Sequence, residues 1–120
     1  METSNHPGAP GIEVQLSVRH GRQAVAFYEA AFGARTCFRF GGTDEAPEVA
    51  AQLQVGSTHF WVEDESAEHG SFSPETVDGA TARLLLVVDD PSAAVDRALT
   101  AGARQVHPVA DSTAGGSDGW

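Results

Sequence analysis

The sequence contains no lysine, since all seven of its basic residues are arginines, and it has one cysteine, Cys37. Without lysine, the chain can carry out neither Schiff-base catalysis nor phosphate binding by a P-loop lysine. A single cysteine excludes an internal disulfide and any zinc site built from several cysteines. A lone cysteine is also typical of a reducing compartment, so we expect a cytoplasmic protein.

The sequence is also poor in positive charge and in long apolar runs. Its 17 acidic residues give a net charge of −10, which leaves no basic surface for nucleic acid or for an anionic membrane. No apolar run approaches the roughly 18 residues of a membrane-spanning helix, and the first ten residues do not resemble a signal peptide. The 120 residues fit one domain with its own core. We therefore expect neither nucleic acid nor a membrane as a partner.

The first half of the sequence predicts the element order β-α-β-β-β. Residues 1–10 are polar and rich in glycine and proline, which predicts a flexible tail. Alternating apolar residues over 12–18 predict a half-buried strand, and apolar residues at helical spacing over 22–32 predict a helix that Gly33 ends. Three further strands are predicted over residues 35–40, 48–55 and 58–63, the last two joined by a tight turn at Gly56.

The second half begins the same pattern again after a polar connection. Residues 82–88 form an apolar run of strand length, and Asp90-Pro91 is a typical helix start. Gly102 would end that helix, and residues 104–109 predict another strand. The helix exit Gly-Ala-Arg at 33–35 recurs at 102–104, an offset of 69 residues, which indicates an internal duplication. By this offset, the last two strands of the second copy would fall beyond Trp120.

Several motifs resemble the vicinal oxygen chelate superfamily, in particular its glyoxalase and bleomycin-resistance branch. They are Phe27-Tyr28 with Ala31-Phe32-Gly33-Ala34 in the first helix, residues 70–74, and the stretch LLLVVDDPSAAVDRALTAGA at 84–103. The resemblance implies an α+β fold in which paired βαβββ modules form a cupped mixed sheet around a cavity. One domain would then span residues 11–120, with module one at 11–65, a linker at 66–80 and an incomplete module two at 81–120.

The resemblance also allows a test of the superfamily's metal site. Metal-dependent members carry one ligand on the first strand, which here implies Gln15 or, in another register, Glu13. Glu63 would be the ligand on the closing strand of module one. The matching position in module two is Arg83 or Leu85, and neither can bind a cation. A catalytic metal keeps about three protein ligands, so Gln15 and Glu63 imply at most an incomplete site for Zn, Ni, Mn or Fe.

Five residues are candidates for binding a small organic molecule: Gln15, Gln52, His59, Trp61 and Arg83. Several of them have a second interpretation that the sequence leaves open. His59 fits an exposed sheet residue or a substitute metal ligand beside Glu63. Trp61 fits a pocket wall, a core or a subunit interface. Arg83 fits an ion pair that joins the modules, or a guanidinium that binds an anionic ligand.

We therefore expect a small-molecule-binding protein of the glyoxalase and bleomycin-resistance type, without a cofactor and with aromatic walls around a flat or polar ligand. The alternative is an enzyme that needs a divalent metal: a glyoxalase-like lyase, a transferase or an extradiol-type dioxygenase acting on a vicinal-oxygen substrate. A third hypothesis is an incomplete member of the superfamily whose sheet is completed by a partner chain. Because open sheet edges pair with other chains, we expect a homodimer.

Overall fold

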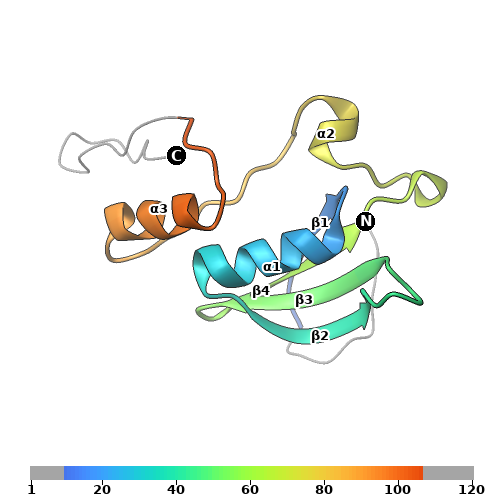
Figure 1. The fold of residues 1–120 in the computed structure, drawn as a ribbon, viewed down its shortest axis with the longest axis horizontal. Helices are drawn as coiled ribbons and strands as arrows, with labels where there is room; N and C mark the ends of the chain where they lie inside the picture. Colours follow the sequence, from blue (N-terminus) through green and yellow to red (C-terminus); the bar gives the residue numbers. More distant parts are fainter. Residues whose placement is uncertain (1–9, 107–120) are drawn as a thin grey trace.

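The computed structural model describes residues 10–106, in which a four-stranded sheet carries one long helix on one face (Figure 1). The elements are β1 (Val14–Val18), α1 (Gly21–Phe32), β2 (Arg35–Gly41), β3 (Val49–Val55), β4 (Thr58–Asp64), the 3-10 turn η1 (Ala67–His69), α2 (Pro74–Val77) and α3 (Pro91–Thr100). The strand order is β1-β4-β3-β2; β1 lies parallel to β4, and the other neighbours are antiparallel. The expected mixed α+β fold is confirmed, as are the strands and helix predicted for the first half.

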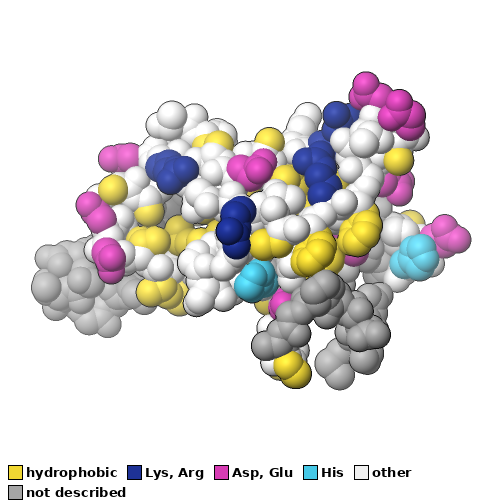
Figure 2. Space-filling view, turned by 90° about the horizontal axis from the view of Figure 1, so that it is seen from below, with side chains coloured by type: hydrophobic (Ala, Val, Ile, Leu, Met, Phe, Trp, Pro, Cys, Tyr) yellow, Lys and Arg dark blue, Asp and Glu magenta, His cyan; other side chains and the backbone are white. Residues whose placement is uncertain are grey.

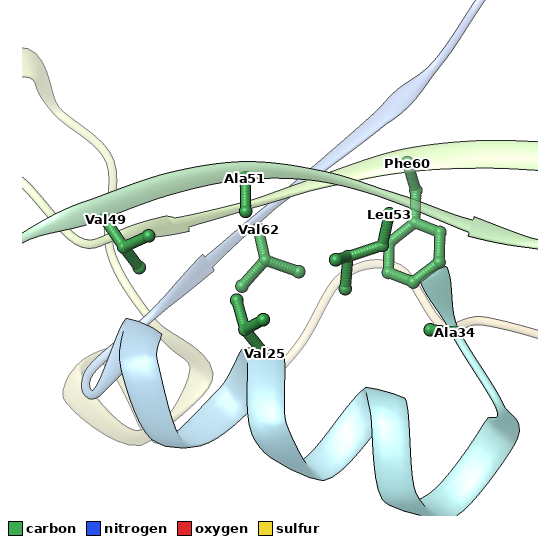
Figure 3. Packing of buried hydrophobic residues seen from close by; sticks show 7 residues of the cluster. All are labelled: Val25, Ala34, Val49, Ala51, Leu53, Phe60 and Val62. Atoms are coloured by element: carbon green, nitrogen blue, oxygen red, sulfur yellow. The ribbon is translucent and has the colours of Figure 1, made fainter. Parts of the chain in front are cut away.

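The core lies between α1 and the sheet. Alternate residues of a strand point to the same face, and this alternation directs Val49, Ala51 and Leu53 of β3 toward the helix. Figure 3 shows Val25 of α1 directed at this face, where Val62 meets it from β4. Leu53 and Val62 are completely buried, so burial of aliphatic side chains holds α1 on the sheet.

A carboxylate at the end of β4 fixes the start of α1. Asp64 accepts a 2.8 Å hydrogen bond from the backbone N–H of Gly21 and a 2.7 Å bond from that of Val49. The carboxylate thereby partners an N–H group of the first helical turn and lies at the positive end of the helix dipole. A Cβ at Gly21 would collide with both Val49 and Asp64, so this close approach requires glycine.

The polar connection after β4 is fastened to the sheet by Glu65. Its carboxylate accepts hydrogen bonds from the backbone N–H of Ser73 at 3.0 Å and from the hydroxyl of Thr76 at 3.0 Å. Arg19 lies 3.6 Å from the same carboxylate. These partners, the Ser73 N–H first among them, hold the pKa of Glu65 below its ordinary value. The predicted polar connection is therefore ordered around one acidic side chain and includes the short helices η1 and α2.

The second half differs from the sequence-based prediction in its strands. The helix α3 forms as predicted, with the Asp90 carboxylate accepting a 3.1 Å bond from the N–H of Ala93. Arg97 joins it to the first half through a 2.9 Å hydrogen bond from Nε to the carbonyl of Ala30 in α1. The strand predicted over 82–88 is not formed, because β1 pairs with β4 and the described residues offer no counterpart of β4 to this segment. Residues 104–106 form no strand either, and the remainder of that predicted strand lies outside the described residues, as does the tail over 1–9.

Candidate functional site

The candidate site is the sheet face opposite α1. Because residues in register across a sheet point to the same side, the pairing places polar and aromatic side chains of all four strands in rows. The central row contains Gln15, Trp61, Gln52 and Phe38. The row beside it contains Ser17, Glu63, Ala50 and Phe40. A third row contains His59, Gln54 and Arg35.

A bulge in β2 directs two phenylalanines to this face. Thr36 pairs with Leu53, which points to the core, whereas Phe38 pairs with Gln52 on the opposite face, and the register shifts between Thr36 and Phe38. The extra residue, Cys37, reverses the side-chain alternation of the strand. Phe38 and the next residue on the same side, Phe40, are 37% and 63% exposed. Figure 2 shows hydrophobic side chains beside arginine and histidine side chains on the underside of the molecule.

Glu13, just before β1, organises the centre of the face. One of its carboxylate oxygens accepts a 2.8 Å hydrogen bond from the amide of Gln52 and a 3.0 Å bond from the indole N–H of Trp61. Gln52 is 3% exposed, so its amide is removed from water and depends on this acceptor. Charged acceptors make the stronger hydrogen bonds, and the pair fixes the orientation of the Trp61 ring.

The structure brings four of the five predicted binding residues to one face. Gln15, Gln52 and Trp61 share the central row, and His59 lies on the same side of β4. Arg83 belongs to the segment between α2 and α3 and lies outside the sheet and the helices.

The residues predicted as metal ligands lie on neighbouring strands of the same face. Gln15 is opposite Trp61, and Glu63 follows two residues later on β4, so the two are diagonal neighbours. Within residues 10–106, no three His, Cys, Asp or Glu side chains come together where they could hold a metal ion. A pair of donors falls short of the three that a catalytic divalent metal needs, so these residues alone do not fit the complete site.

Two features of the site were missed by the sequence analysis. The sequence analysis considered Glu13 as an alternative metal ligand, whereas in the structure it accepts hydrogen bonds from Gln52 and Trp61. Its partners lie 39 and 48 residues away in the chain, so no local motif indicated the contact. The bulge at Cys37 was also missed, because residues 35–40 contain no glycine or proline that would indicate it.

Comparisons with known proteins identify the family of this chain. A family model described as a glyoxalase-like domain matches residues 13–117. The chain belongs to the glyoxalase-like domain family. The X-ray structure of a gene product from Arabidopsis thaliana is similar to this chain, with a TM-score of 0.66 and 30% sequence identity over 84% of this chain and 80% of that one. A comparison with curated proteins finds no match.

The glyoxalase-like assignment confirms the resemblance to the vicinal oxygen chelate superfamily that the helix motifs indicated. The region that the family model matches includes residues 81–106 and therefore α3. None of the helices formed by the described residues has the length and apolar character needed to cross a membrane.

Proposed function

We propose that this glyoxalase-like protein binds a small, flat and polar organic molecule on the sheet face opposite α1, in the manner of bleomycin-resistance proteins. The observation that carries the proposal is the central row, in which Trp61 and Phe38 flank the amide of Gln52. Binding sites for small molecules are mostly apolar walls with a few fixed polar groups, and this row has that composition.

The face offers three kinds of contact to such a ligand. The rings of Phe38 and Phe40 provide stacking surface, since both are partly exposed. The amide of Gln15 can donate and accept hydrogen bonds, and it lies beside Trp61 at the edge strand. Glu63 and His59 add a carboxylate and an imidazole on β4. Because Glu13 already fixes Trp61, little conformational freedom is lost when a ligand stacks on that ring.

Nuclear magnetic resonance tests this proposal directly, because side-chain amides and indoles give their own signals. We would screen planar heteroaromatic amides and acids against the ¹⁵N-labelled chain. Binding should shift the side-chain signals of Gln15, Gln52 and Trp61, while the backbone signals of α1 stay in place. Phe40→Ala should weaken binding about tenfold, because one stacking contact contributes roughly 0.5–1.5 kcal/mol beyond the area it buries. Binders that shift only α1 signals, or a Phe40→Ala variant of unchanged affinity, would contradict the proposal.

A metal-dependent lyase, transferase or dioxygenase is the second candidate, supported by the diagonal arrangement of Gln15 and Glu63. Further ligands would have to come from outside residues 10–106 or from another chain. The test is metal analysis of protein purified without chelator. Stoichiometric Zn, Ni, Mn or Fe that is lost on Glu63→Ala would favour the enzyme over the binding protein. We also propose a cytoplasmic location, supported by the single cysteine.

A further inference from the structure

Two N–H donors from neighbouring strands converge on one oxygen at the centre of the candidate face. The amide nitrogen of Gln52 lies 2.8 Å, and the indole nitrogen of Trp61 lies 3.0 Å, from the same carboxylate oxygen of Glu13. Gln52 and Trp61 are paired directly across β3 and β4, so the sheet fixes the separation of the two donors. Together they form a binding position for a single acceptor oxygen, which a side chain of the protein itself fills.

The chemistry of the two donors selects the groups that can take this position. An indole N–H donates and never accepts a hydrogen bond, whereas an ionised carboxylate accepts and never donates. An ammonium or guanidinium group only donates, so it cannot bond to these donors in place of Glu13. A carboxylate from another molecule would restore both hydrogen bonds at their charge-assisted strength and would leave the charge beside the donors unchanged.

Glu13 lies on a segment that can move without disturbing the sheet. It precedes the first paired residue of β1, and Ile12 before it is 98% exposed. Among the described residues, a Cβ at Gly11 would meet open space. Gln52 is only 3% exposed although it lies on the candidate face, and the Glu13 carboxylate contributes to this cover. A rotation of the segment away from the sheet therefore uncovers both donors without breaking a strand pair.

We infer, on the basis of the proposed function, that the donors of Gln52 and Trp61 form a carboxylate-binding subsite. Glu13 fills this subsite in the free chain, and the carboxylate of an aromatic ligand replaces it on binding. Phe38 is paired with Gln52 on the side away from Trp61, one strand spacing of about 4.8 Å away. A ring joined directly to the bound carboxylate therefore reaches the Phe38 ring and stacks on it. Glu13 acts as an internal competitor that lowers the affinity of the wild-type chain for such ligands.

Rescue of Glu13→Ala by acetate tests the subsite with a defined probe. The substitution removes the internal carboxylate and leaves both donors in place, so free acetate should enter the position. Because a ligand that binds only the folded chain stabilises it, the urea midpoint of Glu13→Ala at pH 7 should rise with acetate concentration. Sodium chloride of equal ionic strength should not raise it. Acetate should also return the indole N–H signal of Trp61 toward its wild-type position. Glu13→Gln, which fills the position with an amide oxygen, and the exposed substitution Glu45→Ala are matched controls that acetate should not stabilise.

Titration with benzoate tests the displacement of Glu13 in the wild-type chain, whose folding no substitution disturbs. Benzoate should move the backbone N–H signals of Ile12 and Glu13, because Glu13 leaves the donors, together with that of Phe38. Benzylamine, which carries the same ring without an acceptor oxygen, should leave these signals in place. Glu13→Ala should bind benzoate at least about tenfold more tightly than wild type, because the wild-type chain must first give up two charge-assisted hydrogen bonds. Circular dichroism verifies that the variant is folded.

Equal effects of acetate and chloride on Glu13→Ala would overturn the subsite, as would equal benzoate affinity of this variant and wild type. Benzoate binding that leaves the signals of Ile12 and Glu13 in place would contradict the displacement. These failures differ from failure of the proposed function. Planar ligands that lose affinity in Phe40→Ala would still support the face as a binding site, even if acetate rescued nothing. Rescue by acetate without any planar ligand would support the carboxylate position and contradict the proposed function.

Discussion

Replacing Glu13 by alanine tests whether this residue organises the candidate site. The substitution removes the oxygen that accepts hydrogen bonds from Gln52 at 2.8 Å and from Trp61 at 3.0 Å. Gln52 is 3% exposed, so water cannot readily replace the lost acceptor. A hydrogen bond to a charged group contributes about 1.5–3 kcal/mol, and leaving a buried donor unsatisfied costs a similar amount. We expect Glu13→Ala to lower the free energy of unfolding by about 3 kcal/mol.

The conservative substitution Glu13→Gln separates the acceptor from its charge. A glutamine carbonyl can still accept from both donors, so the loss should be about 1 kcal/mol, the difference between a charged and a neutral hydrogen bond. Urea unfolding monitored by circular dichroism measures both values. With a slope of about 1–3 kcal/mol per molar urea, Glu13→Ala should shift the midpoint by at least about 1 M. Glu45→Ala, an exposed substitution, should leave the midpoint almost unchanged.

The indole N–H of Trp61 provides a second measurement at the site itself. Its signal should move in Glu13→Ala and stay close to the wild-type position in Glu13→Gln. The reasoning would be refuted by a Glu13→Ala variant within about 0.5 kcal/mol of wild type, the range of ordinary surface substitutions. It would also be refuted if glutamine proved as damaging as alanine.

Three further predictions concern the framework of the site. Asp64→Ala removes two short hydrogen bonds from backbone N–H groups and should lower the free energy of unfolding in urea by about 3 kcal/mol. Asp44→Ala, at an exposed ion pair, should lower it by less than about 0.5 kcal/mol. Gly21→Ala should lower the free energy of unfolding by about 1–3 kcal/mol and lower the melting temperature, because the added Cβ overlaps neighbouring side chains. Gly11 has open space around it, so Gly11→Ala should have the melting temperature of the wild-type protein. Because the pKa of Glu65 is lowered in the folded state, its stabilisation is complete at neutral pH and is lost as the pH falls below about 4.3 toward the lowered value. Between pH 7 and pH 3, the free energy of unfolding of Glu65→Gln should therefore fall less than that of the wild-type protein. If the two proteins lost the same free energy of unfolding over this range, the prediction would be contradicted.

The elements from β1 to β4 could be predicted from the sequence because their signals are local. Alternation over 12–18 and 48–55 identifies strands, and Gly33 ends the helix where its left-handed backbone is observed, at φ 66°. Gly56, at φ 58°, likewise forms the hairpin turn between β3 and β4. Each of these features is decided by a few neighbouring residues, so the elements form where the sequence predicts them.

The site was predictable in its composition but not in its connections. Alternation within a regular strand groups Trp61 with His59 and Glu63, and Gln52 with Gln54. The register between β3 and β4, which brings these two groups to one face, is not contained in that alternation. The same rule would place Phe38 beside Thr36, and only the bulge at Cys37 separates them. The acceptor role of Glu13 depends on the order β1-β4-β3, which brings residues 39 and 48 positions apart into contact. Such contacts are set by topology rather than by local propensity.

A comparison of β1 with residues 82–88 shows that an apolar segment of strand length does not form a strand without a pairing partner. Residues 82–88 are more apolar than β1, yet β1 lies in a sheet and they do not. Strand formation needs a neighbour that receives the backbone hydrogen bonds, and β1 has β4. A helix satisfies its own backbone, so α3 forms without such a neighbour and docks on α1 through Arg97. Strand formation over residues 82–88 therefore needs a neighbouring strand that residues 10–106 do not supply.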